Sequence, residues 1–126
     1  MYNSKSVSVV LPAYNEEQNI HKAVTAFRAI KEIDRIYVID NNSKDRTAPF
    51  AKAAGATVIQ ETRQGYGWAL RRGLAEAETD LVILCEPDGT FVAEDVCKLL
   101  SYERDFLALR GFVWVAKVVG RPRGRV

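Results

Sequence analysis

The sequence predicts an α/β fold in which a mostly parallel sheet carries helices on both faces. Short runs rich in Val, Ile and Leu alternate with segments whose apolar residues recur at helical spacing. Such alternation favours right-handed crossovers and a doubly wound, Rossmann-like sheet. The length of 126 residues, with 48% hydrophobic and 27% charged residues, fits one globular domain.

The first half of the chain supplies three strand-like runs, over residues 7–12, 35–40 and 56–60. Between the first two, Asn15 is expected to cap a helix whose inward face carries apolar residues at helical spacing. These residues are Ile20, Val24, Phe27 and Ile30. A second helix is expected to run to residue 54, where Gly55 ends it.

The second half continues the pattern. A third helix is expected over residues 68–78, and a fourth strand over residues 81–85. A fourth helix over residues 93–103 and a fifth strand over residues 105–110 follow. The fourth strand lacks polar alternation, which is typical of a strand buried on both faces.

Polar clusters follow three of these strands, at residues 14–16, 40–45 and 86–88. The carboxyl ends of parallel strands meet at one edge of a sheet, and ligands of doubly wound folds bind there. Three clusters at one edge therefore favour a ligand site, although each cluster alone is also ordinary turn composition.

The residue types in these clusters suit a nucleotide. Tyr14 offers a flat face for stacking, Glu16 can accept hydrogen bonds from ribose hydroxyls, and Asp40 can accept one from a base. Each also has a structural interpretation, as a ring at the sheet edge, a helix-dipole partner and a turn residue.

The turn before the third helix offers groups for phosphate. Gly65 and Gly67 would let the backbone approach a phosphate, and either Arg71 or Arg72 could reach a diphosphate. No Walker lysine motif is present, and no G-x-G-x-x-G follows the first strand. ATPase and dehydrogenase functions are therefore disfavoured.

Glu86 and Asp88 come directly after the buried fourth strand. In an extended segment, side chains two residues apart point the same way, so the two carboxylates would repel each other without a cation or water between them. They are candidates for holding a divalent metal on a phosphate-bearing ligand. The alternative is a solvated acidic turn.

Charge is distributed unevenly. The net charge is +2, whereas residues 111–126 carry +4, so +2 less +4 leaves −2 for the rest. An acidic body argues against a nucleic-acid partner. No apolar run could span a bilayer and no signal-peptide block is present, so we expect a cytoplasmic location.

Four segments together resemble the nucleotide-sugar-dependent glycosyltransferases of family 2, which have the GT-A fold. They are residues 9–17 (VVLPAYNEE), 38–47 (VIDNNSKDRT), 65–74 (GYGWALRRGL) and 86–91 (EPDGTF). The order and spacing match over roughly residues 6–111. Within this family the sequence resembles enzymes that move a sugar from a nucleoside diphosphate onto a polyprenyl phosphate, such as dolichyl-phosphate mannose synthase.

The resemblance implies a role for individual residues. Pro12, Ala13, Tyr14 and Glu16 match the segment that lines the nucleoside. Asp40 matches the acid that contacts the base, and Arg71 the basic residue near the base and diphosphate. Asp88 and Glu86 match the DXD pair that holds Mg²⁺ or Mn²⁺, with Glu in place of the usual first Asp.

The implied reaction is metal-assisted, inverting transfer of a sugar from a nucleoside-diphosphate sugar to an acceptor. A lipid-phosphate acceptor would bring the protein to the inner membrane face as a peripheral protein. The catalytic residue is not identified, because the family's usual base lies beyond the matching region.

The match fades after residue 111. We therefore divide the chain into a nucleotide-sugar-binding domain, residues 1–111, and a divergent basic tail, residues 112–126. The tail is either a truncated or frame-shifted end, which we favour, or a segment that touches lipid headgroups. We expect a GT-A-like fold that is incomplete at its C-terminus.

Two other functions compete with the transferase. One is a non-catalytic fragment that binds nucleotide sugars, and the other is a receiver-like or phosphatase-like α/β domain that uses acids at strand ends. The latter lacks a suitably placed strand-end lysine.

Overall fold

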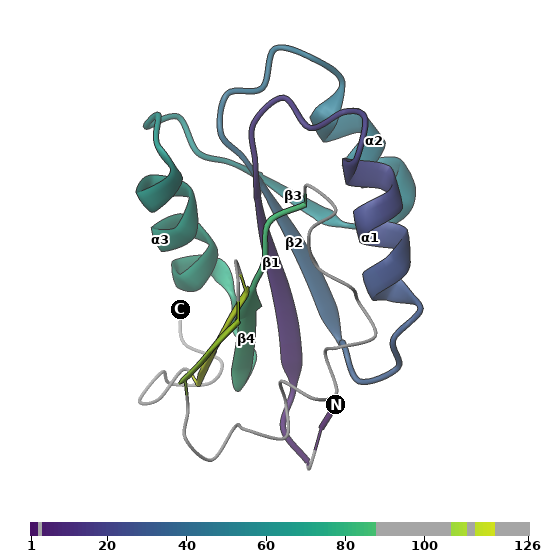
Figure 1. Ribbon diagram of the computed structural model, residues 1–126, viewed down its shortest axis with the longest axis vertical. Coiled ribbons are helices and arrows are strands. Elements are labelled where there is room, and N and C mark those ends of the chain that lie inside the picture. Colours follow the sequence, from purple (N-terminus) through teal and green to yellow (C-terminus); the bar gives the residue numbers. More distant parts are fainter. Residues whose placement is uncertain (3, 88–106, 111–112, 118–126) are drawn as a thin grey trace.

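The structure, a computed structural model, describes residues 1–2, 4–87, 107–110 and 113–117 (Figure 1). Its strands are β1 (Val7–Ala13), β2 (Arg35–Asp40), β3 (Thr57–Gln60), β4 (Leu81–Leu84), β5 (Leu107–Arg110) and β6 (Val113–Lys117). They form one six-stranded sheet in the order β3-β2-β1-β4-β6-β5. The first four strands are parallel to one another, and β6 is antiparallel to both β4 and β5. The mostly parallel sheet is confirmed.

Helices cover both faces of the sheet, as predicted. α1 (Ile20–Arg28) and α2 (Thr47–Ala54) lie on one face, and α3 (Tyr66–Glu76) lies on the other (Figure 1). The period of two along β1 divides the core accordingly. Val9 packs into the cluster that contains Phe27 of α1, whereas Val10 packs into the cluster that contains Ala69 of α3.

Gly73 lets α3 approach β1 closely. A Cβ atom built on Gly73 would clash with Cγ1 of Val10, a fully buried side chain, so part of the core would have to shift. We predict that Gly73→Ala destabilises the fold by about 2 kcal/mol, because overpacking outweighs the better helix propensity of alanine. Urea denaturation would measure the change.

Gly67 provides the matched control in the same helix. A Cβ atom at Gly67 would have no neighbour within 4 Å. Gly67→Ala should therefore be neutral, or stabilise by up to about 1 kcal/mol through helix propensity alone. Equal effects at the two positions would contradict the close packing of α3 on β1.

The helix boundaries differ from the predictions at the start of α1 and at both ends of α3, which ends at Glu76 and not at residue 78. Asn15 does not cap α1; it adopts a left-handed conformation (φ 53°), and the helix begins at Ile20 after Asn19. The reason is tertiary, since the side chain of Asn15 accepts a hydrogen bond from the backbone N–H of Lys44 at 2.8 Å. α3 begins two residues before the predicted start. Gly55 does end α2, in the left-handed conformation (φ 107°).

The C-terminal part of the sheet combines predicted and unexpected pairings. The predicted fifth strand is present as β5, whereas β6 comes from the segment that we assign to the divergent tail. The predicted boundary at residue 111 falls in the connection between these two strands and stays a prediction. The helix expected over residues 93–103 lies outside the described residues. Among the residues described, no helix has the length and apolar character needed to cross a membrane.

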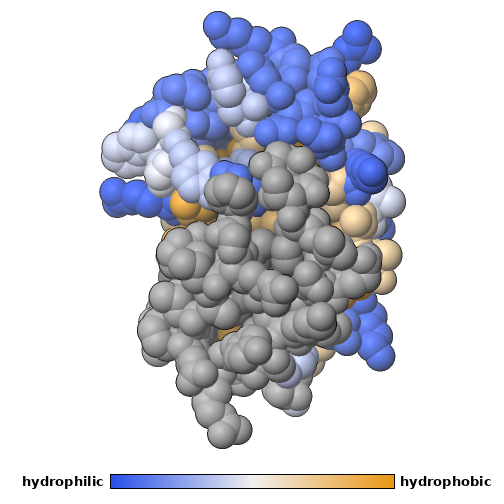
Figure 2. Space-filling model, viewed as in Figure 1, coloured by the Kyte–Doolittle hydropathy of each residue, from blue (hydrophilic) through white to orange (hydrophobic). Residues whose placement is uncertain are grey.

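The connections that leave β1 and enter β4, two neighbouring strands, run over opposite faces of the sheet. The chain passes from β1 through α1 to β2 on one side, whereas β4, the other neighbour of β1, is reached through α3 on the opposite face. In open α/β sheets such a switch point leaves a crevice outside the carboxyl ends of the strands. The described surface at that end is mostly hydrophilic, with some apolar residues between the polar ones (Figure 2).

Candidate functional site

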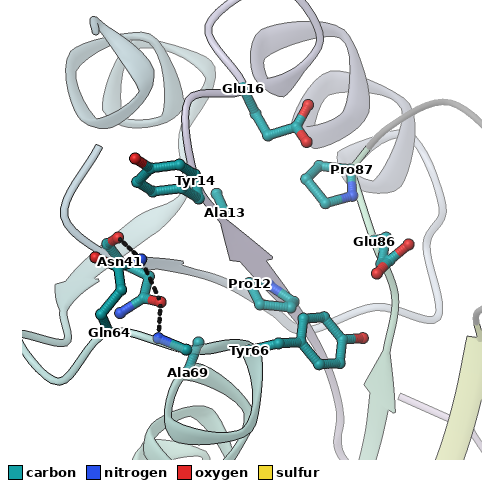
Figure 3. Close-up of a pocket in the computed structure, with 11 residues that line it drawn as sticks. Pro12, Ala13, Tyr14, Glu16, Asn41, Gln64, Tyr66, Ala69, Glu86 and Pro87 are labelled. Carbon is teal, nitrogen blue, oxygen red and sulfur yellow. Dashed lines mark hydrogen bonds between the residues drawn. The ribbon is translucent and has the colours of Figure 1, made fainter. Parts of the chain in front are cut away.

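A cavity of about 390 Å³ lies at the switch point between β1 and β4 (Figure 3). It is lined by Pro12, Ala13, Tyr14, Glu16, Asn41, Gln64, Gly65, Tyr66, Ala69, Glu86 and Pro87. These residues come from the ends of β1, β2 and β4, from the loop after β1, from the loop before α3 and from the first turn of α3. Each of the three predicted polar clusters contributes at least one described residue to this lining: Tyr14 and Glu16, Asn41, and Glu86. A second cavity, of about 360 Å³, is lined by residues near the start of β2, including Arg35.

The end of β1 contributes the residues predicted for the nucleoside. Pro12 and Ala13 are buried and form part of the cavity surface, whereas Tyr14 is 47% exposed. Tyr66, from the first turn of α3, is also 47% exposed. Figure 3 shows the two tyrosines apart, with Pro12 and Ala13 between them. Two accessible rings beside a buried apolar floor suit a flat ligand.

Asp40 is close to the cavity but does not line it. The residue is 4% exposed, and its carboxylate accepts hydrogen bonds from the backbone N–H of Ser43 (3.0 Å) and from Nε2 of Gln60 (2.9 Å). The next residue, Asn41, lines the cavity instead. The carboxylate predicted to contact a base is therefore engaged within the protein.

Arg71 also lies away from the cavity lining. It is exposed on α3, and its guanidinium carbon is 5.2 Å from the centre of the Trp68 ring. The structure therefore places the guanidinium against an indole on the outer surface of the helix. The predicted contact with a diphosphate stays a prediction.

Of the acidic pair after β4, Glu86 lines the cavity and is half-buried, whereas Asp88 lies outside the described residues. Glu16 adds a second carboxylate to the lining. No group of three or more His, Cys, Asp or Glu side chains gathers to hold a metal ion within the described part of the chain. Mg²⁺ is usually bound by one or two carboxylates together with substrate phosphates, so a pair of acids fits such an ion.

Asn41 is the central residue that the sequence analysis missed. Its side chain is buried, and Nδ2 donates to the carbonyl oxygens of Glu61 and Arg63, both at 2.9 Å. Oδ1 accepts from the backbone N–H of Gly65 (2.8 Å) and from Nε2 of Gln64 (3.3 Å). The amide thus uses all of its donors and acceptors on the loop between β3 and α3. It holds that loop against the end of β2.

The G-x-G turn in the sequence points to Gly65 and Tyr66 as cavity residues, but of its two glycines the described lining includes Gly65 alone. Gly65 lines the cavity with a left-handed backbone (φ 135°), whereas Gly67 lies outside the lining. Gln64 and Ala69 carried no recognisable signal in the sequence. Gln64 is held at the cavity by its hydrogen bonds to Asn41, whereas Ala69 belongs to the first turn of α3 and packs into the core.

A second set of contacts, the loop clasp, joins the loop after β1 to the loop after β2. Five hydrogen bonds between described residues form it: Asn15 N to Ser43 Oγ (2.9 Å), Glu16 N to Thr47 Oγ1 (2.8 Å), Glu17 N to Asp45 Oδ2 (3.2 Å), Lys44 N to Asn15 Oδ1 (2.8 Å) and Arg46 N to Glu17 Oε1 (2.9 Å). Because backbone groups of both loops take part, the clasp fixes the positions of Tyr14 and Glu16.

Asp45 is the acid at the centre of the loop clasp. Burial raises the pKa of its carboxyl group, but hydrogen bonds from the Thr47 hydroxyl and from the backbone N–H groups of Glu17 and Thr47 outweigh this effect. The pKa of Asp45 is therefore below its ordinary value of 3.8. The folded state stabilises the charged form.

Glu61 is a second acid with a lowered pKa. The backbone N–H of Arg63, followed by its side chain, lowers the pKa of Glu61 below the ordinary 4.5, and the charge of Arg72 adds to this against the opposing effect of burial. Glu61 lies behind the cavity wall and does not line the cavity.

These two shifts predict how stability depends on pH. Because the pKa values of Asp45 and Glu61 are lower in the folded state, their contribution is fully present above the unfolded values of 3.8 and 4.5. It is lost as the pH falls through the folded values. We expect the free energy of unfolding, measured with urea, to fall below about pH 4.5.

The variant Asp45→Asn tests the assignment. An amide has one oxygen, so it cannot accept all the bonds that Asp45 accepts, and one N–H would face a donor. The variant should be less stable than the wild type at pH 7 and lose less stability in acid. An acid loss as large as that of the wild type would contradict the role of Asp45.

The arrangement can hold a nucleotide carrying phosphate groups. Its rings can stack on a base, and backbone groups can bind a ribose. Its two carboxylates can accept hydroxyl protons or share a divalent cation with phosphate oxygens. The geometry therefore agrees with the resemblance drawn from the sequence.

Comparisons with known proteins point the same way. The model of a family described as Glycosyl transferase family 2 matches residues 8–106. Protein RfbJ of Shigella flexneri is 34% identical over 102 residues, which cover 81% of this chain and 79% of RfbJ. A dolichyl-phosphate hexose transferase of Haloferax volcanii is 31% identical over 104 residues, covering 82% of this chain and 46% of that protein.

A solved structure shares the fold. Glucosyl-3-phosphoglycerate synthase of Mycobacterium tuberculosis, crystallised with Mn²⁺, UDP-glucose and phosphoglyceric acid, has a TM-score of 0.71 and 31% identity. The match covers 79% of this chain and 39% of the synthase, so the chain spans less than half of the synthase and of the hexose transferase. The resemblance to the GT-A fold is confirmed, and the chain belongs to glycosyl transferase family 2.

Proposed function

We propose that the chain binds a nucleoside-diphosphate sugar in the 390 Å³ cavity and transfers the sugar to an acceptor with inversion. The observation that carries the proposal is the convergence of Tyr14, Glu16 and Glu86 on one cavity at the switch point of the sheet. Tyr14 would stack on the base, and Glu16 would accept hydrogen bonds from the ribose. Family membership supports this assignment.

Glu86 and Asp88 would hold Mg²⁺ or Mn²⁺ together with the diphosphate. Carboxylate oxygens are the ligands that these ions prefer, and Glu86 lines the cavity. When bound, the ion would neutralise the negative charge of the departing diphosphate. The synthase of M. tuberculosis was crystallised with Mn²⁺ and UDP-glucose, which supports a similar pairing here.

The acceptor we propose is a polyprenyl phosphate. Its oxygen would attack the anomeric carbon from the face opposite the diphosphate; the new carbon–oxygen bond forms as the bond to the diphosphate breaks. A phosphate monoester has a second pKa of about 6, so it is largely ionised at neutral pH and needs no protein base. The similarity to a dolichyl-phosphate hexose transferase supports this class, which would place the protein at a membrane surface.

A non-catalytic donor-binding fragment is the second candidate. The chain spans 39% of the synthase and 46% of the hexose transferase. Among the described residues, those that line the proposed donor cavity belong to the ends of β1, β2 and β4, the loops that follow β1 and precede α3, and the start of α3. Binding of the donor without transfer would support this candidate.

Two measurements test the proposal. Thermal shift with a panel of nucleoside diphosphates, with and without Mn²⁺, should show metal-dependent stabilisation by at least one of them. Incubation with labelled nucleotide sugars and a polyprenyl phosphate should then give a labelled lipid. No stabilisation by any nucleotide would reject both candidates, whereas stabilisation without product would leave the binding fragment.

A further inference from the structure

The loop between β3 and α3 begins with a buried acid that the proposed reaction does not use. Glu61 is 2% exposed and lies just after β3, the edge strand of the sheet. Its side chain does not line the 390 Å³ cavity. A buried carboxylate needs compensating partners, and those of Glu61 show what it holds in place.

Two arginines surround the Glu61 carboxylate. Oε2 accepts from the backbone N–H of Arg63 at 2.8 Å and from its Nε at 3.2 Å. Oε1 lies 3.5 Å from Nη2 of Arg63 and 3.8 Å from Nη1 of Arg72. Glu61 therefore joins the loop, through Arg63, to the outer side of α3, through Arg72.

The guanidinium of Arg63 continues the contact to an indole. Its central carbon lies 3.9 Å from the centre of the Trp68 ring, within the range of a cation–π interaction. Cδ1 of Trp68 is in turn 3.5 Å from the position that a Cβ atom of Gly65 would occupy. We name Glu61, Arg63 and Trp68 the wall stack, because it ends behind a residue that lines the cavity.

The opposite side of the loop is held by amides. Asn41 binds the carbonyl groups of Glu61 and Arg63, and Asn42 Nδ2 donates to the carbonyl of Thr62 at 3.0 Å. The loop is thus fixed between these amides and the wall stack. Gln64, Gly65 and Tyr66 emerge from it into the cavity.

We propose that Glu61 is a positioning residue for ligand binding, because through Arg63 and Trp68 it holds the cavity wall formed by residues 64–66 in place. The inference rests on the proposed function, since the ligand is taken to be a nucleoside diphosphate. Preorganised walls raise affinity because no ordering is needed at binding, and small displacements of a wall weaken it.

Binding of a nucleoside diphosphate to the full chain, measured by calorimetry, tests the proposal at a temperature where every variant is folded. UDP with Mg²⁺ is the first probe, followed by the other nucleoside diphosphates. Glu61→Gln removes the charge that holds Arg63 while keeping the size of the side chain, and it should weaken binding about tenfold, or about 1.4 kcal/mol. Glu76→Gln is the matched control: it removes the other partner of Arg72, which lies at 3.2 Å on the exposed face of α3, and should leave affinity unchanged.

A double-mutant cycle separates positioning from general loss of stability. Arg63→Ala should weaken binding as much as Glu61→Gln, and the double variant should be no weaker than either single variant, because both act through one contact. Equal affinity of Glu61→Gln and wild type would overturn the proposal. So would fully additive losses.

Fluorescence reads the wall stack without any nucleotide. Trp68 and Trp114 are the only two tryptophans of the chain, so Trp114→Phe leaves Trp68 as the single indole. In that background Glu61→Gln should make Trp68 more accessible to iodide quenching. Unchanged quenching would overturn the stack itself, whereas failure of the wild type to bind any nucleoside diphosphate would reject the proposed function separately.

Discussion

Replacement of Asn41 by alanine is expected to lower the free energy of unfolding by about 3 kcal/mol. The side chain makes four hydrogen bonds to the loop between β3 and α3, three of them to backbone groups. Its removal would leave the carbonyl groups of Glu61 and Arg63 and the N–H of Gly65 without these partners. Each unsatisfied buried polar group costs about 1–3 kcal/mol. Urea denaturation would measure the change.

The neighbouring Asn42 provides the control. Its amide also contacts the loop, at Thr62 and Gln64, but these bonds are exposed to solvent. Because Asn42 has a left-handed backbone (φ 67°), glycine removes the side chain without adding strain. Asn42→Gly should cost less than about 1 kcal/mol. Similar losses at both positions would show that Asn41 has no special role in holding the loop.

Asp88→Ala is expected to abolish the metal-dependent part of nucleotide binding and to reduce sugar transfer more than about 100-fold. A metal ion contributes several kcal/mol to charge stabilisation at a departing diphosphate, and each 1.4 kcal/mol is a factor of about ten in rate. The sequence places Asp88 two residues after Glu86, which lines the cavity. Titration with a nucleoside diphosphate, with and without Mn²⁺, measures the first effect.

Two variants make this result specific. Glu86→Gln should reduce the metal-dependent part of binding as well, and by a smaller factor, since Asp88 is proposed as the main ligand. Glu78→Gln removes one exposed negative charge before β4, at the other end of the sheet, and should change nothing. An undiminished metal effect in Asp88→Ala would reject the metal assignment.

The parts of the fold that the sequence predicted are those determined locally. β1 and β4 are buried on both faces, so continuous apolar runs mark them, and Gly55 ends α2 because the left-handed conformation there suits glycine. The predicted start of α1 was wrong because the conformation of Asn15 depends on its hydrogen bond with Lys44, in the loop after β2. No local pattern carries that information.

The site shows the same division. Tyr14 and Glu16 could be predicted to line a cavity because they directly follow β1, whose carboxyl end lies at the cavity. Which of Asp40 and Asn41 would line it could not be predicted, because neighbouring residues of an extended chain point in opposite directions and composition does not fix the register. The insertion of β6 between β4 and β5 depends on pairing between segments distant in sequence, which local patterns do not specify.

The most direct test of the central claim is amide chemical-shift mapping of the isotope-labelled chain, titrated with nucleoside diphosphates in the presence of Mg²⁺. We predict that the perturbed amides belong to residues 13–16, 41 and 64–69, around the cavity between β1 and β4. The second cavity, lined by Arg28, Arg35 and Thr57, serves as an internal control and should remain unperturbed. Perturbations gathered around that second cavity, or none with any nucleotide, would contradict the proposed site.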